Sequence, residues 1–301
     1  HTGMVGGAIL RRLEDEGYKI LTTTRSEVDL VDQSAVNSFF DTERPQAVFL
    51  AAAKVGGILA NFRYPADFLY QNLLIQANIL EAAFRYECQK VLVLGSSCIY
   101  PKRAPQPMSE DALLTGPLEE TNEAYAIAKI AGIKLAQAYR TQHGCDYISA
   151  MPTNLFGPGD NYDLESSHVV PALLRKFHEA KCLGSPEVVV WGTGTPLREF
   201  MYSEDCADAL VFLMKNYSGP THVNVGTGEE CSIGDLAALI ADVVGFKGDI
   251  RYDTTKPDGT PRKLMDSGKL RGLGWHASHD LRSALVETYG QFRSVEDSAA
   301  A

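Results

Sequence analysis

The first half of the chain alternates two kinds of hydrophobic pattern. Short, nearly continuous apolar runs occupy residues 47–53, 91–96 and 147–151, whereas residues 68–86 and 123–143 have apolar side chains every three or four positions. Runs of the first kind are typical of strands buried on both faces, and segments of the second kind are typical of helices. Strands that alternate with helices predict a doubly wound α/β fold around a parallel sheet.

The start of the chain predicts two further elements of this fold. A β-rich run at residues 18–24 predicts another strand, and the segment from Ala8 onward predicts a helix. In a doubly wound sheet, the strand that precedes the first helix is central. The glycine turn before this helix begins at the first residues of the chain, and no strand pattern stands before it. We therefore expect that residues before His1 supplied this strand.

The pattern changes after Pro152, where prolines and glycines become frequent. The apolar runs that follow are short: 188–191, 222–225 and 249–252. Ser232, three residues before Asp235, predicts the N-cap of an amphipathic helix. We therefore predict a Rossmann domain that binds the cofactor over residues 1–152. A smaller mixed α/β substrate lobe follows over 153–301, with some of its segments returning to the first sheet.

Composition and charge narrow the class of protein. The 301 residues are 45% hydrophobic and 22% charged, which is an ordinary balance for a globular protein. The net charge of −10 argues against a nucleic-acid partner, because a nucleic-acid binder needs a basic face. A few local cations can still bind an anionic substrate. Uncharged stretches are too short to cross a membrane, so no membrane partner is expected.

Cysteine and histidine usage bears on compartment and metal binding. The six cysteines are scattered and include no Cys-x-x-Cys pair, which is typical of reduced thiols in a cytoplasmic protein. The histidines include one close pair, His276 and His279, without the surroundings of a metal-ligand set. We therefore predict a cytoplasmic protein without a bound metal.

Gly3-Met4-Val5-Gly6 is a candidate cofactor turn. Glycines three residues apart before a helix allow backbone N–H groups to approach a pyrophosphate, although a plain turn before a helix gives the same pattern. Arg25 follows the β-rich run, where an arginine favours the 2′-phosphate of NADP. An exposed surface arginine is the alternative interpretation.

A second candidate centre combines Tyr125 and Lys129 with Ser96 and Cys98. Tyr125 and Lys129 stand four positions apart at the start of a predicted helix, so they share one helical face. An ammonium beside a tyrosine favours the phenolate, and we expect Lys129 to lower the pKa of Tyr125. Ser96 and Cys98 follow a predicted strand, at the edge where parallel sheets expose ligand-binding groups. An ordinary helix pair and a small buried cysteine are the alternatives.

The glycine turn, Ser96 and the Tyr125–Lys129 pair together resemble the extended short-chain dehydrogenase/reductase family. Further segments resemble one branch of this family along nearly the whole chain. They are residues 51–57, 95–101, 152–155, 167–174, 191–194, 197–200 and 256–261. The resemblance implies NADP(H) as the cofactor and a homodimer formed through the two long helices.

Members of this branch invert C3 and C5 of GDP-4-keto-6-deoxy-D-mannose and then reduce C4 with NADPH. The resemblance assigns the base and the acid of the inversions to Cys98 and His168. It assigns hydrogen bonds to the C4 oxygen to Ser96 and Tyr125, and contact with the cofactor ribose to Lys129.

The resemblance also implies two sets of ligand contacts. Cofactor contacts fall on Gly3, Met4, Val5, Gly6, Arg25, Ala52, Ser96, Lys129, Asn154, Leu155 and His168. Substrate contacts fall on Lys176, Trp191, Arg198 and Asp258. Cations in the second set suit a diphosphate, while a core aromatic is the alternative for Trp191. Thr2 stands where family members often have arginine, which leaves Arg25 to hold the 2′-phosphate.

Other activities stay open at this point. A nucleotide-sugar 4-epimerase or 4,6-dehydratase of the same family would keep Tyr125 and Lys129 but would hold NAD. Dehydratases place Asp and Glu after the active-site Ser or Thr, whereas Ser97 and Cys98 follow Ser96 here. A relative that binds NADP without catalysis is a third alternative.

Overall fold

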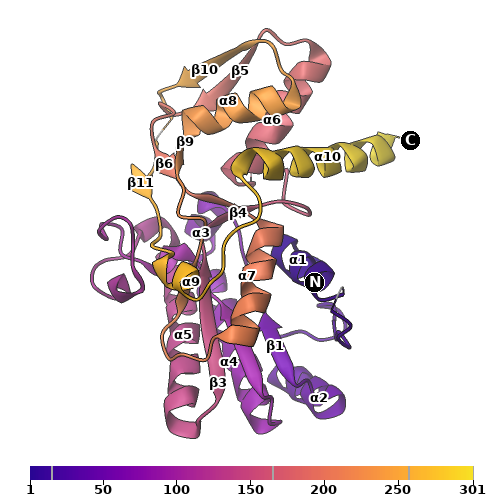
Figure 1. Ribbon diagram of the computed structural model, residues 1–301, viewed down its shortest axis with the longest axis vertical. Helices are drawn as coiled ribbons and strands as arrows, with labels where there is room; N and C mark the ends of the chain where they lie inside the picture. Colours follow the sequence, from indigo (N-terminus) through magenta and orange to yellow (C-terminus); the bar gives the residue numbers. More distant parts are fainter. Residues whose placement is uncertain (15, 165, 257, 301) are drawn as a thin grey trace.

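A four-stranded sheet forms the centre of the lower part of the molecule (Figure 1). Its strands lie side by side in the order β1 (Ala47–Leu50), β2 (Lys90–Leu94), β3 (Asp146–Pro152) and β8 (Val223–Val225). All three pairings are parallel, which confirms the predicted parallel α/β fold. The computed structural model describes residues 1–14, 16–164, 166–256 and 258–300.

Helices cover both faces of this sheet. Alternate side chains of β2 pack with α1 (Met4–Glu14) and α7 (Ser203–Asn216) on one face. The intervening side chains pack on the opposite face with α2 (Gln33–Glu43), α4 (Pro65–Arg85) and α5 (Glu123–His143). Burial of both faces explains why the strand is a continuous apolar run in the sequence.

The strand predicted at residues 18–24 is wrong. These residues are irregular, and a turn follows at 25–27. A strand is held by hydrogen bonds to a neighbouring strand. Among the described strands, β1 is an edge of the sheet and pairs only with β2. The β-rich run does not pair with the free edge of β1 or with another described strand, so its propensity alone does not make it a strand.

A second, smaller core fills the upper part of the molecule (Figure 1). Here β5 (Glu187–Trp191) pairs in parallel with β10 (Asp249–Asp253). The helices α6 (Val169–Leu183), α8 (Ile233–Val244) and α10 (Leu281–Ala300) pack around this pair. The mixed α/β arrangement carries the side chains that the sequence assigns to substrate binding.

Short elements complete the chain between these two cores. They are α3 (Ile58–Arg63), η1 (Ser97–Ile99), η2 (Glu110–Ala112), η3 (Glu120–Asn122), β4 (Asn154–Phe156), β6 (Leu197–Arg198), β7 (Phe200–Tyr202), β9 (Cys231–Ser232), β11 (Arg262–Lys263) and α9 (Gly268–Gly272). Strand β4 pairs with β7, and β6 pairs with both β11 and β9. Ser232 accepts the N–H of Asp235 at 2.9 Å, which confirms the predicted N-cap of α8.

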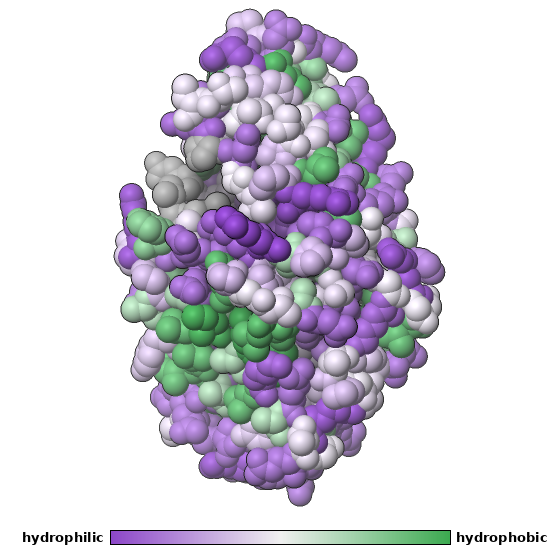
Figure 2. Space-filling model, turned by 90° about the vertical axis from the view of Figure 1, so that its left-hand side faces the viewer, coloured by the Kyte–Doolittle hydropathy of each residue, from purple (hydrophilic) through white to green (hydrophobic). Residues whose placement is uncertain are grey.

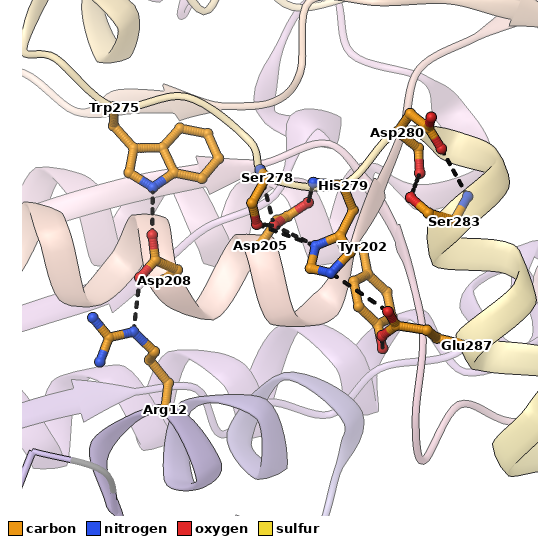
Figure 3. A network of polar contacts seen from close by, with 10 residues as sticks. All are labelled: Arg12, Tyr202, Asp205, Asp208, Trp275, Ser278, His279, Asp280, Ser283 and Glu287. Atoms are coloured by element: carbon orange, nitrogen blue, oxygen red, sulfur yellow. Dashed lines mark hydrogen bonds and ion pairs between the residues drawn. The ribbon is translucent and has the colours of Figure 1, made fainter.

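A buried carboxylate joins the two parts of the molecule (Figure 3). Asp205 of α7 is 2% exposed and accepts a hydrogen bond from the hydroxyl of Ser278 at 2.7 Å. The ring nitrogen Nδ1 of His279 lies 2.9 Å from the same carboxylate. Its other nitrogen, Nε2, lies 3.7 Å from Glu287 of α10. The upper helix α10 is thereby linked to the lower helix α7.

Asp208, one turn later on α7, makes a second link, which lies within the lower core. Its carboxylate accepts a hydrogen bond from the indole N–H of Trp275 at 2.8 Å and from Nε of Arg12 at 2.7 Å (Figure 3). Arg12 belongs to α1, the helix that follows the glycine turn. We call the seven residues of these two links the junction network.

Within the described residues, no group of three or more His, Cys, Asp or Glu side chains is placed to hold a metal ion. No helix in the same part of the chain is long and apolar enough to cross a membrane. All six cysteines are free thiols.

Candidate active site

The carboxyl end of β2 leads into a tight turn that carries Ser96 and Cys98. Ser96 caps the single turn η1, because its hydroxyl oxygen accepts the N–H of Cys98 at 3.4 Å. Gly95 allows the chain before this turn to pack closely against β3, since a side chain there would overlap the sulfur of Met151. Cys98 is 7% exposed, so its thiol lies just beneath the surface.

Tyr125 and Lys129 lie one turn apart at the start of α5. The ammonium of Lys129 is 5.7 Å from the centre of the Tyr125 ring, which confirms that the two side chains share a face. Lys129 is buried and donates a hydrogen bond at 2.8 Å to the carbonyl of Leu94, the last residue of β2. Phe68 of α4 meets the Tyr125 ring edge-on, with centroids 6.3 Å apart. These contacts fix both side chains at the carboxyl end of β2.

The predicted fall in the pKa of Tyr125 is wrong, because the pKa is raised. Burial raises the pKa of the Tyr125 hydroxyl, and negative charge on Cys98 raises it further. Burial also lowers the pKa of Lys129 to about 8. The i, i+4 spacing predicts that the two side chains lie close together. It does not predict that both are buried away from water. For this pair desolvation is the larger effect.

Burial also raises the pKa of the Cys98 thiol, and three side chains oppose this rise. In decreasing order they are the ammonium of Lys263, the hydroxyl of Ser96 and the ammonium of Lys129. The thiolate is the reactive form of cysteine, and nearby cations favour it. The thiol of Cys98 therefore lies among cations and a hydroxyl, although burial is the larger effect on its pKa.

His168 reaches this region from the upper part of the molecule. It occupies the N-cap position of α6, is exposed and makes no side-chain bond to the helix. Partial desolvation and the positive charge of Lys263 lower the pKa of its imidazole. The loop before His168 touches the loop after β1, since a β-carbon at Gly57 would lie 3.2 Å from the carbonyl oxygen of Ser166. The charge of Lys263 thus acts on both His168 and Cys98, which belong to different parts of the molecule.

Lys263 is a residue of this region that the sequence patterns did not single out. It lies on β11, opposite Arg198 of β6 in the parallel register. The only sequence signal is the pair of adjacent cations, Arg262 and Lys263. The side chain of Arg262 pairs with Glu230 at 2.7 Å, whereas the charge of Lys263 interacts with that of Cys98. No pattern in a two-residue strand tells which of the two does so.

The glycine turn leads directly into α1, which begins at Met4. The N–H groups of the first helical turn have no partner within a helix and can meet a pyrophosphate. Space at Gly3 is open, because a β-carbon there would touch nothing. At Gly6 a β-carbon would lie 2.9 Å from the backbone nitrogen of His1, so a glycine is needed for this close approach.

The other predicted cofactor residues differ in the exposure of their side chains and in the hydrogen bonds that these side chains form. Arg25 is exposed and, among the described residues, forms no ion pair or hydrogen bond through its side chain. Ala52 is exposed just beyond β1, and Leu155 is half-buried in β4. The side-chain amide of Asn154 is committed to the backbone, since it donates to the carbonyl of Glu199 at 2.8 Å.

Trp191 ends β5 on the upper part of the molecule and is 62% exposed. This exposure excludes the alternative that it is a core aromatic. Two ammonium groups flank its ring, with Lys176 at 5.2 Å and Lys256 at 5.4 Å from the centroid. Lys176 also donates to the carbonyl of Val189 at 3.4 Å, which fixes it beside the ring.

Arg198 and Asp258 lie next to this aromatic group. Asp258 accepts hydrogen bonds from the N–H of Thr193 at 2.7 Å and from its hydroxyl at 2.8 Å, and so holds the turn after Trp191. A β-carbon at Gly259 would lie 3.6 Å from the guanidinium of Arg198. The four residues predicted to contact substrate therefore form one cluster in the upper part.

Comparisons with known proteins agree with this geometry. The family model described as "NAD dependent epimerase/dehydratase family" matches residues 1–226. GDP-L-fucose synthase 1 of Arabidopsis thaliana is 60% identical over 290 residues, which are 96% of this chain and 90% of that protein. GDP-L-fucose synthase of Sinorhizobium fredii is 58% identical over 294 residues, 98% of this chain and 94% of that protein.

A solved structure extends the comparison to three dimensions. A GDP-L-fucose synthetase from Naegleria fowleri, bound to NADP, superposes with a TM-score of 0.91 at 31% identity. The match covers 98% of this chain and 92% of that one. Sequence and structure thus lead to one conclusion: the chain belongs to the NAD dependent epimerase/dehydratase family.

Proposed function

We propose that this chain converts GDP-4-keto-6-deoxy-D-mannose into GDP-L-fucose, with NADPH as the reductant. The names of its relatives at 60% and 58% identity support this proposal. The observation that carries it is the position of the Cys98 thiol, whose charge interacts with those of both Tyr125 and Lys129. Ketone reduction needs the tyrosine and the lysine, whereas a thiol beside them suits a second step that moves protons.

That second step is the inversion of C3 and C5, the two carbons that flank the C4 ketone. A proton on either carbon is acidic, because the electron pair left behind is delocalised into the carbonyl as an enolate. Inversion removes the proton from one face and returns a proton to the other, so a base and an acid must lie on opposite faces. Cys98 and His168 approach the site from the two parts of the molecule and are proposed as this pair.

Ser96 and Tyr125 are proposed to donate hydrogen bonds to the C4 oxygen. Such donors stabilise the negative charge that develops there in the enolate and again during reduction. Bound NADPH supplies the hydride for C4, and Tyr125 gives its proton to the oxygen. The raised pKa of Tyr125 keeps this proton in place until the oxygen becomes charged. The ammonium of Lys129, on the same face, then favours its release.

The residues of the lower part fit NADPH. The first turn of α1 offers N–H groups for the pyrophosphate. Arg25 has no carboxylate partner among the described residues and is available for the 2′-phosphate. Lys129 uses one hydrogen on Leu94 and has two more for the ribose. The remaining proposed contacts are Ala52, Asn154, Leu155 and His168.

The cluster around Trp191 is proposed to hold the GDP part of the substrate. An exposed aromatic ring suits stacking against a nucleobase. The guanidinium of Arg198 can form two parallel hydrogen bonds with a diphosphate, and Lys176 adds a point charge. Because the chain carries a net charge of −10, these few cations must act locally. Asp258 supports the cluster by holding the turn after Trp191.

We further propose a cytoplasmic homodimer. Six free thiols support a reducing compartment. The outer sides of α4 and α5 expose large apolar side chains: Tyr70, Leu73, Phe84 and Ile127. Figure 2 shows hydrophobic residues gathered on the lower half of the face on which α5 lies. Apolar groups exposed together are typical of interfaces. Sedimentation of the purified protein as a 32.8 kDa monomer would contradict this assembly.

The division into an NADP-binding domain (1–152) and a substrate lobe (153–301) is proposed with one refinement. Helix α7 and strand β8 lie in the second range but pack on or pair with the sheet of the first. They would therefore unfold together with the NADP-binding domain. Hydrogen exchange that shows α7 opening with α6 instead would contradict this division.

The activity is tested by mixing the purified protein with NADPH and GDP-4-keto-6-deoxy-D-mannose. NADPH is expected to be oxidised only when this sugar is present, and the product is identified by NMR as GDP-L-fucose. Three outcomes contradict the proposal. They are turnover of UDP-glucose without net use of cofactor, loss of water from GDP-mannose, and NADPH binding without turnover.

The variant Cys98→Ser separates the two halves of the reaction. Loss of the thiol is expected to slow solvent-deuterium incorporation at C3 and C5 by about 100-fold or more, since this is the usual contribution of a general acid or base. NADPH binding stays within about twofold, because Cys98 is not a proposed cofactor contact. Cys182→Ser, at an exposed cysteine on α6, is the matched control. Wild-type exchange in Cys98→Ser would remove the thiol from the mechanism.

A further inference from the structure

Glu199 is a buried carboxylate that the proposed reaction does not use. It stands between β6 and β7 and is 0% exposed. No cation in the part of the chain that the structure describes forms an ion pair with it. A carboxylate taken out of water destabilises a fold unless hydrogen bonds compensate it. The hydrogen bonds of Glu199 therefore indicate its role.

Both oxygens of this carboxylate accept backbone N–H groups. Oε1 accepts the N–H of Gly228 at 2.8 Å, and Oε2 accepts the N–H of Met265 at 3.2 Å. Gly228 follows β8 at the carboxyl end of the central sheet, whereas Met265 follows β11. A side chain at Gly226 would overlap the carboxylate, so the loop after β8 packs directly on it. The carboxylate thus joins the central sheet to the chain that leaves β11.

The residue before Glu199 is Arg198, the cation proposed to bind the diphosphate. Neighbouring side chains of an extended chain point to opposite sides, so Arg198 faces the cluster around Trp191 while Glu199 faces the interior. Strand β6, which carries Arg198, has two residues, and so has each of its partners β9 and β11. Few backbone bonds hold so short a strand, and the two bonds of Glu199 add to them.

We propose that Glu199 is a positioning residue for substrate binding, whose carboxylate holds Arg198 in place for the diphosphate of the GDP-sugar. The inference rests on the proposed function in taking the guanidinium of Arg198 as the diphosphate contact. Two parallel hydrogen bonds from a guanidinium need a fixed position and direction. A cation that is held in place before binding loses less conformational entropy when the diphosphate arrives. Loss of the bonds of Glu199 is therefore expected to weaken binding through Arg198.

A further contact concerns the proposed cofactor residue Asn154. Its side-chain amide donates to the backbone carbonyl of Glu199 at 2.8 Å. This carbonyl is present whatever side chain stands at position 199. Replacement of the carboxylate alone is thus expected to leave the proposed cofactor contacts in place. NADPH binding therefore distinguishes a local effect on Arg198 from a general loss of structure at the site.

The test is a double-mutant cycle on the binding of GDP, measured by calorimetry with the purified protein. GDP carries the diphosphate without the sugar. The four proteins are the wild type, Glu199→Gln, Arg198→Leu and the double variant. Glu199→Gln keeps the size of the side chain but turns an amide NH2 group toward one of the two backbone N–H groups. One of the two hydrogen bonds is thereby lost.

Glu199→Gln is expected to raise the Kd for GDP about tenfold in the wild-type background but less than about twofold in the Arg198→Leu background. The two effects are not additive, because both substitutions remove the same contact with the diphosphate. The Kd for NADPH stays within about twofold in all four proteins. Equal factors in the two backgrounds, or an unchanged Kd for GDP in Glu199→Gln, overturn the inference.

Asp205→Asn is the matched control, because Asp205 is also a buried carboxylate and bonds to Ser278 rather than to a segment of the site. It is expected to lower the unfolding temperature and to leave the Kd for GDP unchanged. A merely structural role of Glu199 would make the two variants behave alike. Where Glu199→Gln does not fold, Glu199→Asp keeps the charge but is too short to reach both N–H groups. It is judged by the same cycle.

The cycle is independent of turnover. Coupling between Glu199 and Arg198 in a protein that binds GDP but does not convert the GDP-sugar would refute the proposed function and not the positioning role. Additive effects in a protein that does convert the GDP-sugar would overturn the inference and leave the proposed function standing. Arg198→Leu without effect on GDP binding would remove Arg198 from the diphosphate site and overturn the inference with it.

Discussion

Charged side chains have opposite surroundings in the junction network and at the candidate active site. In the junction network each charge meets an opposite one: Arg12 lies 2.7 Å from Asp208, and Nδ1 of His279 lies 2.9 Å from Asp205. At the site, Lys129 and Arg198 bond only to backbone carbonyls, at 2.8 Å each. Neither has a carboxylate within ion-pair distance among the described residues.

This difference separates paired charges, which hold the fold, from unpaired charges, which are proposed to bind a ligand. An unpaired cation taken partly out of water destabilises a protein unless an anion arrives to compensate it. The site keeps such cations where a diphosphate and an enolate are proposed to bind. Substitutions are therefore expected to change activity at the site and stability at the junction.

The largest expected effect on activity comes from Tyr125→Phe. Loss of the hydroxyl removes the proposed proton donor and is expected to lower the rate of NADPH oxidation by about 100-fold to 10,000-fold. The phenyl ring keeps its contact with Phe68, so the unfolding temperature stays unchanged. Enzyme kinetics and thermal unfolding measure the two effects. Activity within tenfold of wild type would exclude Tyr125 as the donor.

A smaller but more specific effect is expected from Arg198→Leu. Loss of a charge-assisted contact with the diphosphate is expected to raise the KM for the GDP-sugar about 10-fold to 100-fold, since such bonds contribute about 1.5–3 kcal/mol. Unfolding by urea is expected to show no loss of stability, because no carboxylate loses its partner.

The matching substitution in the junction network is Arg12→Leu, which is compared with Arg198→Leu. The side chain of Arg12 is 33% exposed, so we expect a loss of only about 1 kcal/mol of unfolding free energy. The KM for the GDP-sugar stays within about twofold. A stability loss in Arg198→Leu that equals that of Arg12→Leu would erase the distinction between the two regions.

Local patterns in the sequence predicted the elements whose contacts are local. The helix expected at 123–143 is α5 (Glu123–His143), and the run at 91–96 contains most of β2 (Lys90–Leu94). The run at 18–24 has a similar composition but forms no strand, because a strand also depends on a neighbour distant in the sequence. Propensity alone carries no information about that neighbour.

The candidate site was also predicted only in part. Spacing was enough to place Tyr125 and Lys129 on one face, since both belong to one helix. It gave the wrong direction for the pKa of Tyr125, because burial is a property of the assembled site. Lys263 was missed for the same reason. Its position depends on backbone hydrogen bonds to distant parts of the chain, such as that from Met108 to Leu264. The sequence of a two-residue strand does not predict these bonds.

Among the site cations, Arg25 is expected to show a more modest effect. It is exposed, so its proposed contact with the 2′-phosphate of NADPH is partly screened by water. Arg25→Ala is expected to raise the KM for NADPH about tenfold and to leave the KM for NADH within about twofold. Kinetics with both cofactors measure the ratio. An equal rise for both would place Arg25 outside the 2′-phosphate site.

The smallest expected effect is the contribution of His279 to stability, and it depends on pH. Burial alone would lower the pKa of His279, but the hydrogen bond and charge of Asp205, with the charges of Glu287 and Asp280, raise it overall. A histidine whose folded pKa is raised binds its proton more tightly in the folded state. Its stabilisation is therefore complete below the unfolded pKa of about 6.5 and is lost as pH rises through the folded value.

The variant His279→Gln keeps a hydrogen-bond donor but cannot be charged. The wild-type protein is expected to exceed it by about 1 kcal/mol of unfolding free energy near pH 5.5, and to lose this advantage near pH 9. Urea unfolding at the two pH values measures the difference, and other titrating groups cancel between the two proteins. An advantage that is the same at both pH values would mean that the junction network depends on the shape of the imidazole. Charge pairing would then no longer distinguish the junction from the site.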